Sequence, residues 1–126
     1  MAAPIRVLLV EDNDAYRDTI VFLLRRRDEV AVVGEVSDGS SAAAACAEHC
    51  ADVVVVDYRL PDVSGAVAAA EIRERCPQAS VVFLSAFAGT EELEAARIAG
   101  VTLVRKDQGV DALVEAIRAA ASRGLI

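Results

Sequence analysis

The sequence predicts a doubly wound α/β fold, in which five helices cover both faces of a five-stranded parallel sheet. The first observation is Val53–Val56, because an unbroken run of β-branched residues is typical of a strand buried on both faces. The second is that strand-like and helix-like segments alternate five times, as in consecutive βα units with right-handed crossovers. The third is length: 126 residues fit one domain, 1–126, with a tail or linker expected to start within 122–126.

Two kinds of pattern predict the individual elements. Short apolar runs indicate the strands, and apolar residues three or four positions apart indicate the helices. Tyr16, Ile20 and Leu23 have this spacing in the first helix, and Val110 and Leu113 begin it in the last. In chain order we expect a strand at 5–10, a helix at 15–26, a strand at 31–36, an alanine-rich helix from the turn 37–40 to about 50, a strand at 53–57, a helix at 65–76, a strand at 80–84, a helix at 90–99, a strand at 101–104 and a last helix reaching 121.

Polar residues, glycine and proline mark where these helices begin and end. The acidic cluster Glu11–Asp14 can cap the first helix, and Thr90 and Asp107 are placed to cap the fourth and fifth. Two acids follow Thr90, where the helix dipole favours negative charge. Pro77 stops the third helix and Gly100 ends the fourth. Four of the five predicted helices therefore have a boundary signal of this kind.

Composition and charge argue against nucleic-acid binding by this domain. The net charge is −7, the pI is near 4.6 and only five residues are aromatic. Binding to a phosphate backbone requires clustered lysine and arginine, and single strands also need aromatic stacking surfaces. The one dense basic run, Arg25–Arg27, fits the C-terminal end of the first helix, where cations offset the helix dipole.

Cysteine usage and the N-terminal segment point to a cytoplasmic protein. Cys46, Cys50 and Cys76 are an odd number, and we expect small buried cysteines with reduced thiols. A metal site built on the first two with His49 is an alternative that lacks a fourth ligand nearby. Met1–Pro4 leads straight into a strand, so no signal peptide is expected, and no apolar stretch reaches the length of a membrane span.

Four motifs follow four of the predicted strands and should meet at one edge of the sheet. They are Glu11 with Asp12, then Asp57, Ser85 and Lys106. Each alone could be a helix cap or solvated surface. Together, three carboxylates repel one another unless a cation lies among them, and oxygen ligands suit Mg²⁺. The amine and the hydroxyl could hold phosphoryl oxygens while Asp57 acts as the nucleophile that forms an acyl phosphate.

These motifs resemble the receiver domain of bacterial two-component response regulators. The matching stretches are Val7–Asn13, Val54–Asp62 with Gly65, Leu84–Ala86 and Lys106–Asp107. The resemblance covers essentially the whole chain and implies a flavodoxin-like (receiver) fold. It implies that Asp57 takes a phosphoryl group from the phosphohistidine of a sensor histidine kinase. It further implies that Glu11, Asp12, Asp57 and the main-chain carbonyl of Arg59 hold Mg²⁺.

The resemblance also implies partners and a role. Ser85 and Lys106 would contact the phosphoryl oxygens, together with the main-chain N–H of Ala86. The Lys106–Asp107 pair resembles the subfamily that joins a receiver to a helix-turn-helix DNA-binding domain. The chain would then be a signalling phosphoacceptor rather than an enzyme, with a C-terminal output domain that controls transcription and a homodimer on phosphorylation among its expected states.

Two departures from the family pattern keep other hypotheses open. Most receivers have an aromatic switch residue three positions before the lysine, where this sequence has Leu103, and the approach at Gly100–Thr102 is one residue short. A pseudo-receiver that acts as a phosphorylation-independent interaction module is therefore one alternative. A phosphohydrolase of the haloacid dehalogenase type is another, but it needs an acid where this sequence has Arg59.

Overall fold

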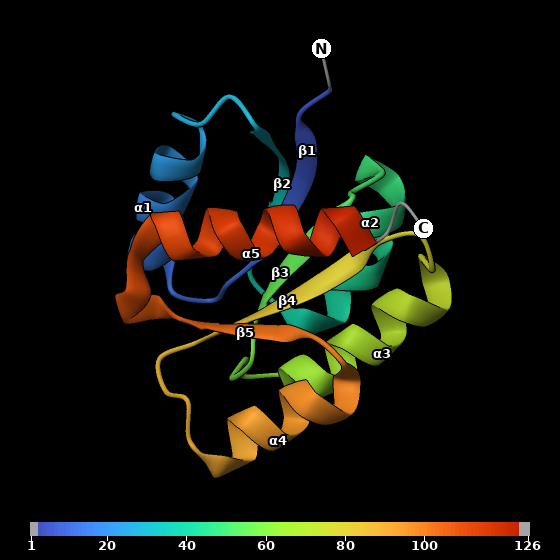
Figure 1. Cartoon of the computed structure of the whole chain (residues 1–126). Helices are drawn as coiled ribbons and strands as arrows, with labels where there is room; N and C mark the ends of the chain where they lie inside the picture. Colours follow the sequence, from blue (N-terminus) through green and yellow to red (C-terminus); the bar gives the residue numbers. More distant parts are fainter. Residues whose placement is uncertain (1–2, 124–126) are drawn as a thin grey trace.

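The computed structural model describes residues 3–123 and contains one sheet of five parallel strands in the order β2-β1-β3-β4-β5 (Figure 1). The strands are β1 (Ile5–Val10), β2 (Val30–Val36), β3 (Val53–Asp57), β4 (Ser80–Ser85) and β5 (Thr102–Arg105). The helices are α1 (Asp14–Leu24), α2 (Ala42–His49), α3 (Gly65–Arg75), α4 (Thr90–Ala99) and α5 (Gly109–Arg123), with short 3₁₀ turns η1 (Gly39–Ser41) and η2 (Lys106–Gln108). The predicted fold class is confirmed.

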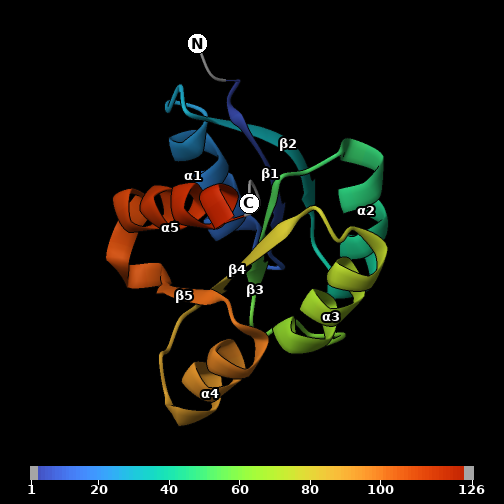
Figure 2. The ribbon, with the colours of Figure 1, turned by 45° about the vertical axis from the view of Figure 1, so that its right-hand side comes forward.

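Helices cover both faces of the sheet, as Figure 2 shows: α1 and α5 lie on one side, and α2, α3 and α4 on the other. The central strand β3 supplies both cores. Val53 and Val55 belong to the cluster with α1 and α5, whereas Val54 and Val56 belong to the cluster with the other three helices. All four side chains are fully buried. The unbroken apolar run is thus explained by helices on both faces.

The strand order reverses direction between the first and third strands. From β1 the chain crosses to β2 on one side, and from β2 it crosses back to β3 on the other side of β1. Such a reversal leaves a crevice outside the carboxyl ends of the two strands, where ligands bind in open α/β sheets. Val10 pairs in register with Val56, so Glu11 and Asp57 follow at equivalent positions of neighbouring strands.

Most predicted boundaries agree with the structure within two residues, but the expected cap of α4 was wrong. Thr90 is the first residue of the helix, and Gly89 is the N-cap. The reason is that the Leu93 N–H bonds to the Gly89 carbonyl oxygen at 3.0 Å, which places the first helical hydrogen bond one residue earlier. In α1 the cap does come from the predicted acidic cluster, because the Asn13 side chain accepts a hydrogen bond from the Tyr16 N–H at 2.9 Å.

The expected cap of α5 was also wrong. Asp107 lies inside the 3₁₀ turn η2, and its carboxylate accepts a hydrogen bond from Arg105 Nε at 2.9 Å. Residues 106–108 form this 3₁₀ turn, so α5 begins only at Gly109. The helix includes residues 122 and 123, and residues 124–126 of the expected tail lie outside the described residues.

The arginine triplet lies at the end of α1, as predicted. Arg25 is the C-cap residue of the helix, and the Arg26 guanidinium lies over the Phe22 ring at 5.6 Å from its centroid. Arg27 forms an ion pair with Asp111 of α5. The triplet therefore closes one helix and ties it to a second, in keeping with a structural role.

Two of the three cysteines are buried as expected, and the third is not. Cys46 and Cys76 are buried, and burial raises the pKa of the Cys46 thiol to about 12. Cys50 is exposed at the C-cap of α2, where it has the left-handed φ of 52° that commonly ends a helix. Across residues 3–123, no cluster of three metal-ligating side chains includes a cysteine.

In the same residues, no helix combines the length and apolar character needed to cross a membrane.

Gly65 lets the first turn of α3 approach the end of β3. A Cβ at this position would lie 2.7 Å from Tyr58 Cα and 3.2 Å from the Asp57 carbonyl oxygen, and both neighbours are backbone atoms. We predict that Gly65→Ala lowers the free energy of unfolding by about 1–3 kcal/mol, as overpacking does, when measured by urea denaturation. Gly100→Ala is the control: it meets no neighbour but has a φ of 69°, so it should lose only about 1–2 kcal/mol through its conformation. A smaller loss for Gly65→Ala than for the control would contradict this account.

Asp62 links the loop after β3 to the start of α2. Its carboxylate accepts hydrogen bonds from the Gly39 and Ser40 N–H groups at 3.0 and 2.9 Å, which lower its pKa from the ordinary 3.8 to about 2. Because the folded pKa is the lower one, the stabilisation is complete above pH 3.8 and disappears as the pH falls through about 2.

We therefore predict that Asp62→Asn is less stable than the unmodified chain at pH 7, and that the difference shrinks toward zero near pH 2. Urea denaturation across this pH range measures the difference. Asp18→Asn on exposed α1 controls for the loss of one negative charge. A stability gap for Asp62→Asn that persists unchanged at pH 2 would show that the carboxylate acts by some other means.

Candidate functional site

The structure brings the four predicted motifs together at the carboxyl edge of the sheet. Glu11 follows β1, Asp57 ends β3, Ser85 ends β4 and Lys106 follows β5. Glu11 and Asp57 are 0 and 5% exposed, which is unusual for carboxylates. Ser85 is 1% exposed, and Asp12 is exposed. Buried acids need partners, so their contacts define the site.

Asp57 is held through both carboxylate oxygens. Oδ1 accepts a hydrogen bond from the Arg59 N–H at 2.9 Å, and Oδ2 accepts one from Lys106 Nζ at 2.9 Å. The backbone around it is fixed as well, because the Tyr58 N–H bonds to the Leu84 carbonyl at 2.9 Å. Asp57 is therefore a positioned carboxylate at the carboxyl end of β3, with a cation beside it.

Glu11 shares the same ammonium group. Its Oε2 accepts a hydrogen bond from the Asn13 N–H at 3.0 Å, and its Oε1 lies 2.7 Å from Lys106 Nζ. This second contact is an ion pair whose angles fall outside hydrogen-bond geometry, so Oε1 is a buried oxygen without a hydrogen-bond donor within residues 3–123.

Burial sets the direction of the pKa shift for Glu11, and the neighbouring carboxylates set it for Lys106. Desolvation raises the pKa of Glu11 to about 7, with the neighbouring Asp57 acting in the same direction and Lys106 opposing it. Burial alone lowers the pKa of Lys106, but its ion pairs with Glu11 and Asp57 together outweigh burial and raise it. Lys106 therefore keeps its proton, and with it its positive charge, as expected for an amine beside two carboxylates.

The acid cluster fits a hard divalent cation. One oxygen each from Glu11, Asp12 and Asp57 lies within 4.8 Å of the other two, and no other such group occurs among residues 3–123. The orphaned Glu11 oxygen offers a lone pair, and the exposed Asp12 leaves room for water ligands, as Mg²⁺ prefers. Arg59 is adjacent through its N–H bond to Asp57, and the assignment of its carbonyl as a ligand stays a prediction.

Ser85 lies at the same edge, one strand further along the sheet. Its Oγ accepts a hydrogen bond from the Phe87 N–H at 3.3 Å, so the hydroxyl is held by its own loop. Ala86 follows and is exposed. Leu103 is half-buried on β5 and packs against the core cluster that contains α4. The hydroxyl and the leucine thus belong to neighbouring strands, of which β4 leads into α4 and β5 follows it.

Two contacts at the site were not predicted. Arg59 reaches α4, where its Nε donates to Glu92 Oε2 at 3.0 Å and its guanidinium lies 3.5 Å from Glu91. Glu92 was expected in the first turn of a helix, but it is almost fully buried, and the hydrogen bond from Arg59 lowers its pKa. Tyr16 was assigned only to the apolar stripe of α1, yet its ring lies under Lys106 Nζ at 4.5 Å from the centroid. No sequence spacing signals either contact, since the partners are distant along the chain.

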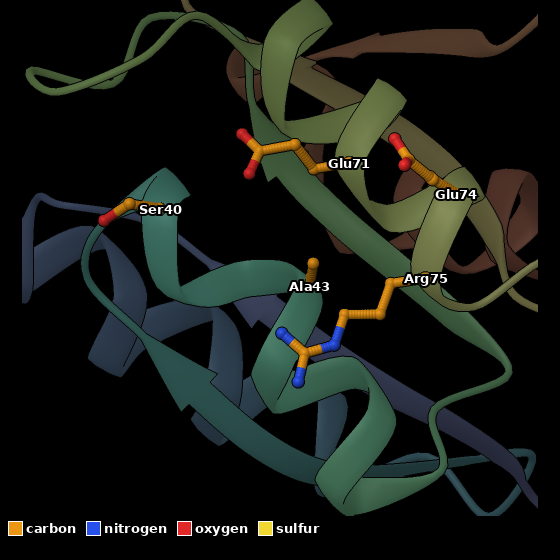
Figure 3. Close-up of a pocket in the computed structure, with 5 residues that line it drawn as sticks. All are labelled: Ser40, Ala43, Glu71, Glu74 and Arg75. Carbon is orange, nitrogen blue, oxygen red and sulfur yellow. The ribbon is translucent and has the colours of Figure 1, made fainter.

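A separate hollow of about 440 Å³ opens between α2 and α3 (Figure 3). Ser40 and Ala43 line one side, Glu71, Glu74 and Arg75 line the other, and the Arg75 side chain extends from α3 toward α2. None of these residues contributes to the acid cluster. The hollow is polar surface between two helices and is distinct from the candidate site.

Known proteins provide a direct comparison. Residues 7–118 match the model of the response regulator receiver domain family. The chain is 34% identical over 119 residues to the "Uncharacterized transcriptional regulatory protein YxjL" of Bacillus subtilis, covering 93% of this chain and 54% of that protein. It is 35% identical over 123 residues to the "Transcriptional regulatory protein PdtaR" of Mycobacterium tuberculosis, covering 97% and 59%. The chain thus spans little more than half the length of these relatives.

A solved structure gives the same result. The "two-component response regulator, LuxR family, from Aurantimonas sp. SI85-9A1" superposes with a TM-score of 0.86 at 31% identity, over 94% of this chain and 86% of that one. The family match begins within β1 and ends within α5, so it contains all four motifs of the candidate site. The chain belongs to the response regulator receiver domain family, the signalling receivers of two-component systems.

Proposed function

We propose that Asp57 is the phosphoacceptor of this receiver and that its phosphorylation, with Mg²⁺ bound, switches an output surface. One observation carries the proposal: Asp57 ends the central strand with Lys106 Nζ 2.9 Å from one oxygen and with oxygens of Glu11 and Asp12 within 4.8 Å. A nucleophilic carboxylate, a fixed ammonium group and an acidic metal site are the parts that phosphoryl transfer requires.

The transfer forms one bond and breaks another. An oxygen of Asp57 attacks the phosphorus of a phosphohistidine, a P–O bond forms, and the P–N bond breaks with its electron pair returning to the imidazole nitrogen. Lys106 and the Ser85 hydroxyl hold the equatorial phosphoryl oxygens, with the N–H of Ala86 as a third donor. The catalytic side chains of the proposed step are thus Asp57, Ser85 and Lys106.

Glu11, Asp12, Asp57 and the Arg59 carbonyl would hold Mg²⁺. When bound, the ion offsets the repulsion between these carboxylates and the incoming phosphoryl oxygens. The protein supplies the ligands for this ion in advance, because Glu11 and Asp57 are buried and have oxygens within 4.8 Å of each other.

The proposed donor is a sensor histidine kinase, and the proposed output is control of transcription through a C-terminal DNA-binding domain. The names of the relatives as transcriptional regulators, and their greater length, support this assignment. A phosphoryl group adds about −1.5 to −2 charge, and readout would use the Ser85–Phe87 loop and α4. Leu103 is smaller than the aromatic residue of other receivers, so the accompanying rearrangement on β5 should be small. A homodimer is one form that the phosphorylated state could take.

The first prediction from this proposal concerns the nucleophile. Asp57→Asn should abolish phosphorylation by acetyl phosphate with Mg²⁺, because the amide is a far weaker nucleophile, while the fold is retained. Mass spectrometry of the intact protein detects the added phosphoryl group. Asp28→Asn, at an exposed position outside the site, is the control and should be phosphorylated normally. Undiminished phosphorylation of Asp57→Asn would move the phosphoacceptor elsewhere, and an unreactive unmodified chain would favour the phosphorylation-independent interaction module.

The second prediction concerns the metal. Asp12→Ala should weaken Mg²⁺ binding at least about tenfold, the lower end of what loss even of an outer-shell partner costs. Removing one of three mutually repelling carboxylates should leave the metal-free domain at least as stable as before. Isothermal calorimetry and urea denaturation measure the two effects, with Asp18→Ala as the control for charge. Equal Mg²⁺ affinity in Asp12→Ala and the control would place the metal at other ligands.

A further inference from the structure

Lys106 is the only lysine in the sequence, and an aromatic ring lies beneath it. Its Nζ is 2.7 Å from Glu11 Oε1, 2.9 Å from Asp57 Oδ2 and 4.5 Å from the centroid of the Tyr16 ring. The lysine side chain is 20% exposed, so these three groups replace most of its water. A partly desolvated ammonium over an aromatic face is attracted by the negative face of the ring.

The ring is placed by its own helix rather than by the lysine. Tyr16 stands in the first turn of α1, where its N–H is bonded to the capping Asn13 side chain at 2.9 Å. The side chain is half-buried and packs against the core cluster that α1 shares with α5. The Tyr16 ring is therefore held at the edge of the site by α1 and by its core contacts.

The other two partners of Lys106 do not have this independence. Glu11 and Asp57 are also the carboxylates that converge on the proposed metal position. A divalent cation there would bind the same oxygens, repel the ammonium and weaken both ion pairs. The aromatic face has no charge for the metal to neutralise, so its attraction for Lys106 would remain.

We propose that Tyr16 is a positioning residue that keeps the Lys106 ammonium at the site while a divalent cation occupies the carboxylates. The inference rests on the proposed function for its purpose, since Lys106 would otherwise be free to leave before a phosphoryl group arrives. The ring supplies attraction without taking any N–H of the ammonium as a hydrogen-bond donor. The contact with the ring therefore does not compete with phosphoryl oxygens for the ammonium N–H groups.

The single lysine permits a direct test. Protein labelled with ¹³C at the lysine ε carbon gives one ε-methylene signal, and a ring face above or below it shifts the attached protons upfield. The unmodified chain and Tyr16→Phe, which keeps the ring, should show this upfield shift both without and with saturating Mg²⁺. Tyr16→Leu keeps the apolar bulk but removes the π face, and its signal should lie at the position of an unshielded lysine.

Reactivity is the second readout. Tyr16→Leu should be phosphorylated by acetyl phosphate about threefold to thirtyfold more slowly, the range of a partly desolvated cation–π contact, while Tyr16→Phe keeps the original rate. The Mg²⁺ affinity of Tyr16→Leu, measured by calorimetry, should not fall, because Tyr16 is no metal ligand. Urea denaturation shows that both variants are folded.

The outcomes separate this inference from the proposed function. Loss of the upfield shift on adding Mg²⁺ to the unmodified chain, or an unchanged shift in Tyr16→Leu, would overturn the role of Tyr16. So would equal phosphorylation rates for Tyr16→Leu and Tyr16→Phe. A chain that takes no phosphoryl group at all would refute the proposed function instead, while the lysine signal with and without Mg²⁺ would still decide whether Tyr16 holds Lys106.

Discussion

The site depends on one ammonium group shared by two buried carboxylates. Glu11 and Asp57 are almost fully removed from water, and two unpaired charges in such a place would cost far more than the few kcal/mol by which a domain is stable. Lys106 lies within 2.9 Å of both and offsets that cost. A divalent cation or a phosphoryl group entering this site would change the charge balance that now holds the lysine, and this makes the same cluster suited to switching.

The sheet makes this sharing possible, because three strands deliver the three groups to one point. Register between β1 and β3 sets Glu11 beside Asp57, and β5 ends two strands away with the lysine on its C-terminal side. The long side chain of Lys106 spans the remaining gap across β4. Close approach of α3 at Gly65 then fixes the backbone around Asp57. Main-chain geometry therefore positions the acids, and one flexible side chain completes the site.

Sequence reasoning predicted the sheet, its two helical layers and the meeting of the acids with Ser85, because these follow from strand ends in a parallel sheet. It failed where a short polar residue had two local options: Thr90 and Asp107 were expected to cap helices, but Gly89 and a 3₁₀ turn took those positions. It also missed the ring of Tyr16 and the partner of Arg59. Those contacts join residues far apart in the chain, and only the packed structure decides them.

Arg59 connects the site to α4 through two different parts of one residue. Its N–H holds Asp57 Oδ1, while its guanidinium holds the buried carboxylate of Glu92 in the first turn of α4. Loss of the Arg59 contact would leave the Glu92 carboxylate without its cation, so this one side chain joins the loop after β3 to the start of α4.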